Sequence, residues 1–112
     1  MKIFLDTADV SLICDRLGTG LIDGITTNPT LIARSQRKPD DVYHELINSG
    51  IKDISMEVVG NAPEMVSEGL RLSDLFGDNA TIKVPCTPDG LMACRELARN
   101  HHIRVNVTLI FN

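Results

Sequence analysis

Short runs of apolar and β-branched residues alternate along this chain with longer stretches in which apolar residues recur at helical spacing. The alternation predicts five strands, over residues 2–6, 21–27, 54–59, 80–85 and 103–111. The helical spacing predicts four helices, over residues 9–17, 39–49, 63–76 and 87–98. We expect residues 30–38 to be a less regular connection with one helical turn at 31–33. Strict alternation of strands and helices indicates a parallel sheet with right-handed crossovers.

The predicted strands have one apolar and one polar face. The polar face carries Phe4, Asp6, Gly24, Thr26, Asn28, Ser55, Glu57, Thr81, Lys83, Asn106 and Thr108. A layer of helices covers an apolar face, whereas a polar face suits the interior of a β/α barrel, in which catalytic groups lie at the carboxyl ends of the strands. We therefore expect an α/β fold of the TIM (β/α) barrel type. Residues 1–112 would supply the first five strands and four helices, as the N-terminal part of a single β/α-barrel domain.

Lys83 is the unusual residue of the run from Ala80 to Pro85, whose other members are apolar or small. Its ammonium could reach water at the end of the strand, which is the ordinary behaviour of lysine. Alternatively, burial destabilises the charged form and leaves a neutral amine, which attacks a carbonyl and forms a Schiff base. The run alone favours the first interpretation, and the polar face shared with other strands favours the second.

Composition narrows the classes of function. The chain has 112 residues, of which 43% are hydrophobic and 23% charged, as in one soluble globular domain. Its formal net charge of -4 argues against nucleic acid or an anionic membrane as a partner. Three cysteines, at positions 14, 86 and 94, have no metal-type spacing and fit reduced thiols. With neither a signal peptide nor a membrane-spanning run, we expect a cytoplasmic protein.

Polar residues fall at or near the ends of all five predicted strands: Asp6, Asn28, Glu57, Lys83, Asn106 and Thr108. Two carboxylates and one amine provide a nucleophile and proton-transfer groups for imine chemistry. Structural roles are also open, since Asp6 could cap the first helix, Asn28 could be a turn residue before proline, and Glu57 could pair with Lys83. His44, His101 and His102 have no partners at ligand spacing, so we expect no metal site.

Five motifs resemble those of the small transaldolase and fructose-6-phosphate aldolase-like family. They are Leu5-Asp-Thr-Ala8, Gly24-Ile-Thr-Thr-Asn-Pro-Thr30, Met56-Glu-Val58, Ile82-Lys-Val-Pro85 with Thr87-Pro-Asp-Gly-Leu91, and Asn106-Val-Thr-Leu-Ile-Phe-Asn112. The resemblance covers the whole chain in the family's order and spacing. It implies a class I, metal-free barrel that needs no cofactor, and a sugar phosphate as the small-molecule substrate.

The resemblance also implies a role for each matching residue. Lys83 corresponds to the lysine that forms the Schiff base with a ketose phosphate donor, and Asp6 to the acid/base on the hydroxyl of the bond being broken. Glu57 corresponds to the residue that shuttles protons through a water held by Thr108. Asn28 and Asn106 correspond to the asparagines that bind the dihydroxyacetone part, and Thr26 belongs to the same substrate-binding set.

Three alternatives stay open. Glutamate at position 57 resembles transaldolases proper, whereas the aldolase branch is expected to have glutamine, so transfer is favoured over fructose-6-phosphate aldolase-type cleavage. A complete eight-stranded barrel takes about 250 residues, and the family's phosphate-binding arginine and serine would lie beyond the fifth strand. The chain could therefore be an inactive truncated fragment that only assembles. A flavodoxin-like module is a third alternative, although this sequence lacks the acidic residues that a phospho-acceptor site would need.

Open edges lead to a prediction about assembly. Five parallel strands do not close a barrel, so the first and fifth strands would each leave an unpaired edge. We expect such edges to recruit a second copy of the chain, which makes a homo-oligomer the predicted state.

Overall fold

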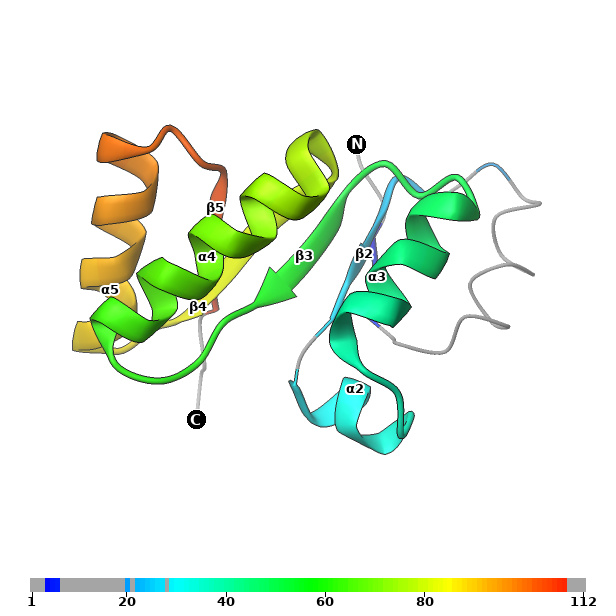
Figure 1. Cartoon of the computed structure of the whole chain (residues 1–112), viewed down its shortest axis with the longest axis horizontal. Coiled ribbons are helices and arrows are strands. Elements are labelled where there is room, and N and C mark those ends of the chain that lie inside the picture. The colour runs from blue at the N-terminus through cyan, green and yellow to red at the C-terminus, as the bar shows by residue number, and fades with distance from the viewer. Residues whose placement is uncertain (1–3, 7–19, 21, 28, 109–112) are drawn as a thin grey trace. The chain divides into compact units, whose positions relative to one another are not determined.

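The computed structural model describes residues 4–6, 20, 22–27 and 29–108. They form an α/β fold with an open, parallel sheet, whose strands are neighbours in chain order. Figure 1 labels the strands and helices. The strands are β1 (Phe4–Asp6), β2 (Gly24–Thr26), β3 (Ile54–Glu57), β4 (Ala80–Pro85) and β5 (Val105–Thr108). The helices are α2 (Pro29–Arg34), α3 (Pro39–Asn48), α4 (Ala62–Phe76) and α5 (Pro88–Arg95). The predicted class and the predicted order of strands are thus confirmed.

The chain divides into two compact units, Met1–Ile54 and Ser55–Asn112. In the first unit, β1 and β2 pair in parallel, with Phe4 opposite Gly24 and Asp6 opposite Thr26. The backbone N–H of Ile25 donates to the carbonyl oxygen of Asp53 at 2.9 Å, which brings the chain entering β3 beside β2. The core of this unit consists of buried apolar side chains from β2, both helices and the loop before β3: Ile25, Ile32, Val42, Tyr43, Leu46 and Ile51.

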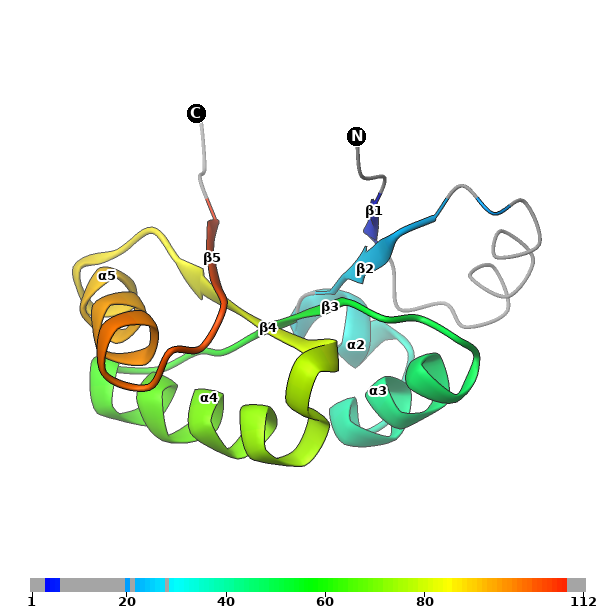
Figure 2. The same ribbon diagram turned by 90° about the horizontal axis from the view of Figure 1, so that it is seen from above.

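In the second unit, α4 and α5 lie next to each other along one side of β4 (Figure 2). In β3 and β4 the residues that alternate with the polar positions are fully buried, with Met56, Ile82 and Val84 each 0% exposed. Gly69 in α4 permits close packing on this side, because a Cβ at this position would lie 2.9 Å from Cδ1 of Leu97. The apolar face of the strands therefore carries the helix layer, as the alternation predicts.

Side-chain caps fix where the two helices of the second unit begin. Asn61 and Glu64 form a capping box before α4: the Glu64 N–H donates to Asn61 Oδ1 at 2.9 Å, and the Asn61 N–H donates to Glu64 Oε1 at 3.2 Å. Thr87 caps α5, since its Oγ1 accepts from the Gly90 N–H at 3.0 Å. The cap predicted at Thr87 is confirmed. At α4 the helix begins one residue before the predicted start.

Several predicted bounds are wrong. Residues 29–34 form the helix α2 and not a single turn, because Pro29 suits a first helical position and Ile32 is buried. Two helices therefore lie between β2 and β3. Strand β3 ends at Glu57, before Val59, which is 60% exposed. Strand β5 begins at Val105 and not at Ile103, because the Ile103 N–H donates to the Leu97 carbonyl instead of to the sheet.

The predicted helix over 9–17 lies outside the described residues. So do residues 2–3 and 21 of the first two predicted strands and residues 109–111 of the last one. The fourth helix is predicted to end at residue 98. In the structure, α5 ends at Arg95 and a π-helical segment, Glu96–Asn100, follows it directly. Each helix within the described ranges is too short or too polar to cross a lipid bilayer.

Candidate functional site

Three polar residues form a row across β3, β4 and β5. Asn106 is the partner of Lys83 in the parallel register of β4 and β5. On the other side of β4, the Val58 N–H donates to the carbonyl oxygen of Lys83 at 2.9 Å. In a parallel ladder such a bond aligns the donor with the residue after the acceptor, so Val58 faces Val84 and Glu57 faces Lys83. Glu57, Lys83 and Asn106 are therefore neighbours on three consecutive strands.

This row lies on the side of the strands away from α4 and α5. Ile82 and Val84 flank Lys83 in the sequence, and both are completely buried on the helix side. Successive side chains of a strand point to opposite faces, so Lys83 projects from the other face. It is half-buried there, as is Glu57, whereas Asn106 is exposed. An amine and a carboxylate thus share one partly desolvated surface, where their electrostatic interactions are stronger than in water.

Ser55 links β3 directly to β5. The side-chain amide of Asn106 donates from Nδ2 to Oγ of Ser55 at 3.1 Å, although β4 lies between the two strands. Neighbouring strands are about 4.8 Å apart, so a flat sheet would keep side chains two strands apart out of hydrogen-bonding range. The contact indicates that the polar face is concave. Curvature of this kind gathers the row into one hollow surface, as expected for part of a barrel.

Thr108 follows Asn106 by two residues in β5, and its partner in the register of β4 and β5 is Pro85. Thr108 as a whole is half-buried, but its hydroxyl oxygen, Oγ1, is fully buried. This oxygen has no hydrogen-bond partner among the described residues. A buried hydroxyl without a partner costs about 1–3 kcal/mol. Such a group is suited to bind a polar ligand or a water molecule next to the row.

Two predicted site residues lie in the first unit. Asp6, at the end of β1, is paired in register with Thr26 at the end of β2. The Asp6 residue is exposed and Thr26 is half-buried. These two residues are therefore brought together at the carboxyl ends of β1 and β2. Asn28, the remaining predicted residue, lies outside the described residues.

The end of β4 is held by local features of the sequence. Pro85 ends the strand, and the Thr87 N–H then donates to the Pro85 carbonyl at 2.9 Å. Gly90 passes so close to that carbonyl that a Cβ would lie 1.8 Å from its oxygen. The turn between β4 and α5 therefore depends on this glycine, and it fixes the strand end two residues beyond Lys83.

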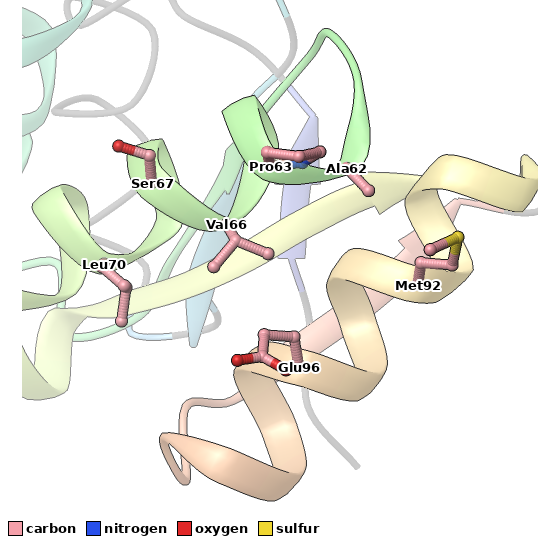
Figure 3. Close-up of a pocket in the computed structure, with 7 residues that line it drawn as sticks. All are labelled: Ala62, Pro63, Val66, Ser67, Leu70, Met92 and Glu96. Carbon is pink, nitrogen blue, oxygen red and sulfur yellow. The ribbon is translucent and has the colours of Figure 1, made fainter.

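Within the ranges that the structure describes, no three His, Cys, Asp or Glu side chains gather as metal ligands would. Cys86 is exposed and Cys94 half-buried, and both are free thiols. An open apolar groove of about 530 Å³ lies between α4 and α5, with Val66, Leu70 and Met92 among its lining (Figure 3). Its lining comes from the helices, so the groove contains no residue of the polar row.

Ser55 is a residue of this surface to which sequence reasoning assigned no role. The alternation of polar and apolar positions placed it on the correct face, two residues before Glu57. Its contact with Asn106 joins positions 51 residues apart. The sequence alone does not reveal this contact, because it depends on the register of three strands and on the curvature of the sheet.

Comparison with known proteins agrees with the motifs. A sequence model of the family described as Transaldolase/Fructose-6-phosphate aldolase matches residues 3–112. A "Probable transaldolase" of Nitrosopumilus maritimus (strain SCM1) is 48% identical over 113 residues, which cover 100% of this chain and 50% of that protein. A "Probable transaldolase" of Caulobacter vibrioides (strain NA1000 / CB15N) is 45% identical, with 100% of this chain and 51% of that protein covered.

A third relative, a "Probable transaldolase" of Geobacter sulfurreducens (strain ATCC 51573 / DSM 12127 / PCA), is 48% identical, with 99% of this chain and 51% of that protein covered. The chain thus spans about half the length of the curated relatives it matches. The match to the family model extends over all five strands, and it confirms the resemblance seen in the motifs. This chain belongs to the transaldolase/fructose-6-phosphate aldolase family.

Proposed function

We propose that this protein carries out a transaldolase-like, class I aldol transfer of a dihydroxyacetone unit between sugar phosphates. The observation that supports this function most strongly is the row of Glu57, Lys83 and Asn106 on neighbouring strands. It combines an amine, a carboxylate and an amide on one concave face. An imine-forming site needs such a set: a nucleophile, a proton-transfer group and a donor of hydrogen bonds to the substrate.

Lys83 acts as the nucleophile in this proposal. Its neutral amine attacks the keto carbon of the donor, and loss of water gives an iminium ion. The carbon-carbon bond beyond the adjacent carbon then breaks, and its electron pair flows into the iminium to form an enamine. Asp6 takes the proton from the hydroxyl group whose carbon leaves as an aldehyde. The enamine adds to an acceptor aldehyde, Asp6 returns the proton, and water releases the new ketose from Lys83.

Glu57 and Thr108 handle protons while the imine forms and hydrolyses. Glu57 lies in register beside Lys83, and Thr108 offers a buried hydroxyl with no partner among the described residues. We propose that Thr108 holds the water that is expelled or consumed, and that Glu57 exchanges a proton with it. Glutamate at this position resembles transaldolases proper, whereas the aldolase branch is expected to have glutamine, so Glu57 supports transfer over the aldolase-type alternative.

Binding of the donor is assigned to three residues. Asn106 is next to Lys83 in register, and Thr26 is next to Asp6 in register. Their side chains, together with Asn28, would donate and accept hydrogen bonds with the hydroxyl groups of the dihydroxyacetone part. A polyhydroxylated substrate is bound well only when such polar groups are positioned in advance.

Further properties of the whole protein follow from the same proposal. Residues 1–112 would be the N-terminal part of one β/α-barrel domain, in which catalytic groups from several strand ends face the same interior. The substrates would be sugar phosphates, the protein would act in the cytoplasm, and neither nucleic acid nor a membrane would be a partner. The β1 and β5 edges would favour a homo-oligomer.

Trapping of the imine tests the function. The chain is incubated with unphosphorylated dihydroxyacetone and reduced with borohydride, and the modified lysine is located by mass spectrometry of its peptides. We expect one adduct, on Lys83, that is lost in Lys83→Met and retained in the control Lys52→Met, whose lysine is exposed. Unmodified wild-type protein, or equal labelling of Lys83 and Lys52, would overturn the proposal.

A further inference from the structure

Asn106 has a buried support that its proposed binding role would require. Its amide donates from Nδ2 to Ser55 Oγ at 3.1 Å, and the Ser55 residue is 1% exposed while Asn106 is exposed. The register that aligns Glu57 with Lys83 also aligns Ser55 with Thr81. The hydrogen bond therefore crosses β4 between the positions of Thr81 and Lys83. It joins a fixed hydroxyl to an exposed amide beside the reactive lysine.

We infer that Ser55 is a positioning residue that sets the orientation of the Asn106 amide for binding of the keto donor at Lys83. This inference rests on the proposed function. An asparagine amide rotates broadly about its last side-chain torsion, so an exposed one has no fixed orientation of its own. The contact with Ser55 occupies one of its two N–H donors and selects one orientation. The other N–H and the carbonyl oxygen then face the polar surface, where the hydroxyl groups of a donor would lie.

Burial makes Ser55 suited to this task. A hydroxyl on a serine that is 1% exposed moves little, because neighbouring atoms enclose its side chain. Ser55 touches no reacting atom in this proposal, and it acts only through Asn106. Loss of its hydroxyl should therefore weaken binding of the donor and leave proton transfer at Glu57 unaffected.

A purely structural role for Ser55 predicts a different result. In that case Ser55→Ala would lower stability, and the donor concentration that gives half-maximal trapping would be unchanged. A positioning role predicts a higher half-saturating concentration with a similar limiting rate. It also predicts that the effect disappears when Asn106 is absent, because two residues that act through one contact are not additive.

The experiment measures the rate of borohydride trapping at Lys83 against dihydroxyacetone concentration. Loss of one net hydrogen bond is expected to raise the half-saturating concentration about fivefold in Ser55→Ala, and Ser55→Thr, which keeps a hydroxyl, should recover most of that loss. Ser55→Ala should have no further effect in Asn106→Ala. Ser49→Ala is the matched control, because it removes a serine hydroxyl that donates to a carbonyl four residues away, that of Glu45, at 2.9 Å.

The outcomes separate the two proposals. A fivefold rise in Ser55→Ala that is absent from the Asn106→Ala background and from Ser49→Ala supports the positioning role. Trapping of wild type and Ser55→Ala with the same concentration dependence overturns it and leaves the proposed function standing. Additive effects of the two substitutions also overturn it. Failure of the wild-type protein to form any adduct at Lys83 overturns the proposed function and this inference together.

Discussion

Replacement of Gly90 by alanine should destabilise the protein through the turn that ends β4. A Cβ at this position would lie 1.8 Å from the Pro85 carbonyl oxygen and 2.9 Å from its carbon. Both are backbone atoms, so no side-chain rotation can relieve the clash. The start of α5 must instead move by more than an ångström from the end of the strand that carries Lys83.

Two effects of opposite sign determine how much Gly90→Ala changes the free energy of unfolding. Alanine in place of glycine favours a helix by about 1 kcal/mol. Insertion of a methyl group into a closely packed site typically costs 1–3 kcal/mol, and contact with backbone places Gly90 at the upper end, roughly 3 kcal/mol. The clash therefore prevails, with a net loss of about 2 kcal/mol. For a domain of this size such a loss lowers the melting temperature by roughly 8 °C.

Thermal and urea unfolding, followed by circular dichroism, measure this loss. Gly69→Ala is the matched control, because its Cβ would be too close only to the end of the Leu97 side chain, at 2.9 and 3.1 Å, and would be in ordinary contact with Cγ2 of Ile82 at 3.5 Å. Side-chain ends can move, so the clash and the gain in helix propensity should nearly cancel, within about 1 kcal/mol. A Gly90→Ala protein as stable as wild type, or no less stable than Gly69→Ala, would refute this reasoning.

Four further substitutions give distinct results. Glu57→Gln should slow imine formation at least about 100-fold in a trapping time course, because an amide cannot exchange the proton; an unchanged rate would exclude the shuttle role. Asn61→Ala removes half of the capping box and should lower the free energy of unfolding by about 1 kcal/mol, and an unchanged urea midpoint would contradict this. Arg104→Met removes hydrogen bonds to two backbone carbonyls and should cost about 1 kcal/mol. Arg71→Met, which breaks the surface ion pair with Glu68, should change stability by less than about 0.5 kcal/mol; equal losses for the two arginines would contradict the account.

The alternation of apolar and polar residues along the strand was sufficient to predict the face on which Lys83 lies. Ile82 and Val84 are apolar and buried against the helices, which leaves Lys83 on the other face. The predicted bounds of this strand agree with β4, because Thr81, Ile82 and Val84 favour a strand and Pro85 ends it. Local chemistry of this kind is contained in the sequence itself, and so the fold class and the face of the lysine could be predicted.

Other features depend on tertiary packing. Helix α2 is short and has a single buried residue, Ile32, so its six residues show too little periodicity to be distinguished from a turn. The hydrogen bond between Ser55 and Asn106 depends on the register and curvature of three strands. Strand β5 begins later than predicted because the Ile103 N–H bonds to the preceding helical segment, a competition that local propensity does not reveal.

Transfer of a labelled three-carbon unit tests the central claim most directly. The protein is incubated with fructose 6-phosphate labelled in its dihydroxyacetone part and with an aldose phosphate acceptor, and the products are followed by carbon NMR. Transaldolase-like chemistry at Lys83 predicts that the label appears in a new ketose phosphate, and that Lys83→Met produces none. Release of the label as free dihydroxyacetone would identify an aldolase instead. Transfer that persists in Lys83→Met would contradict the assignment of the reactive lysine.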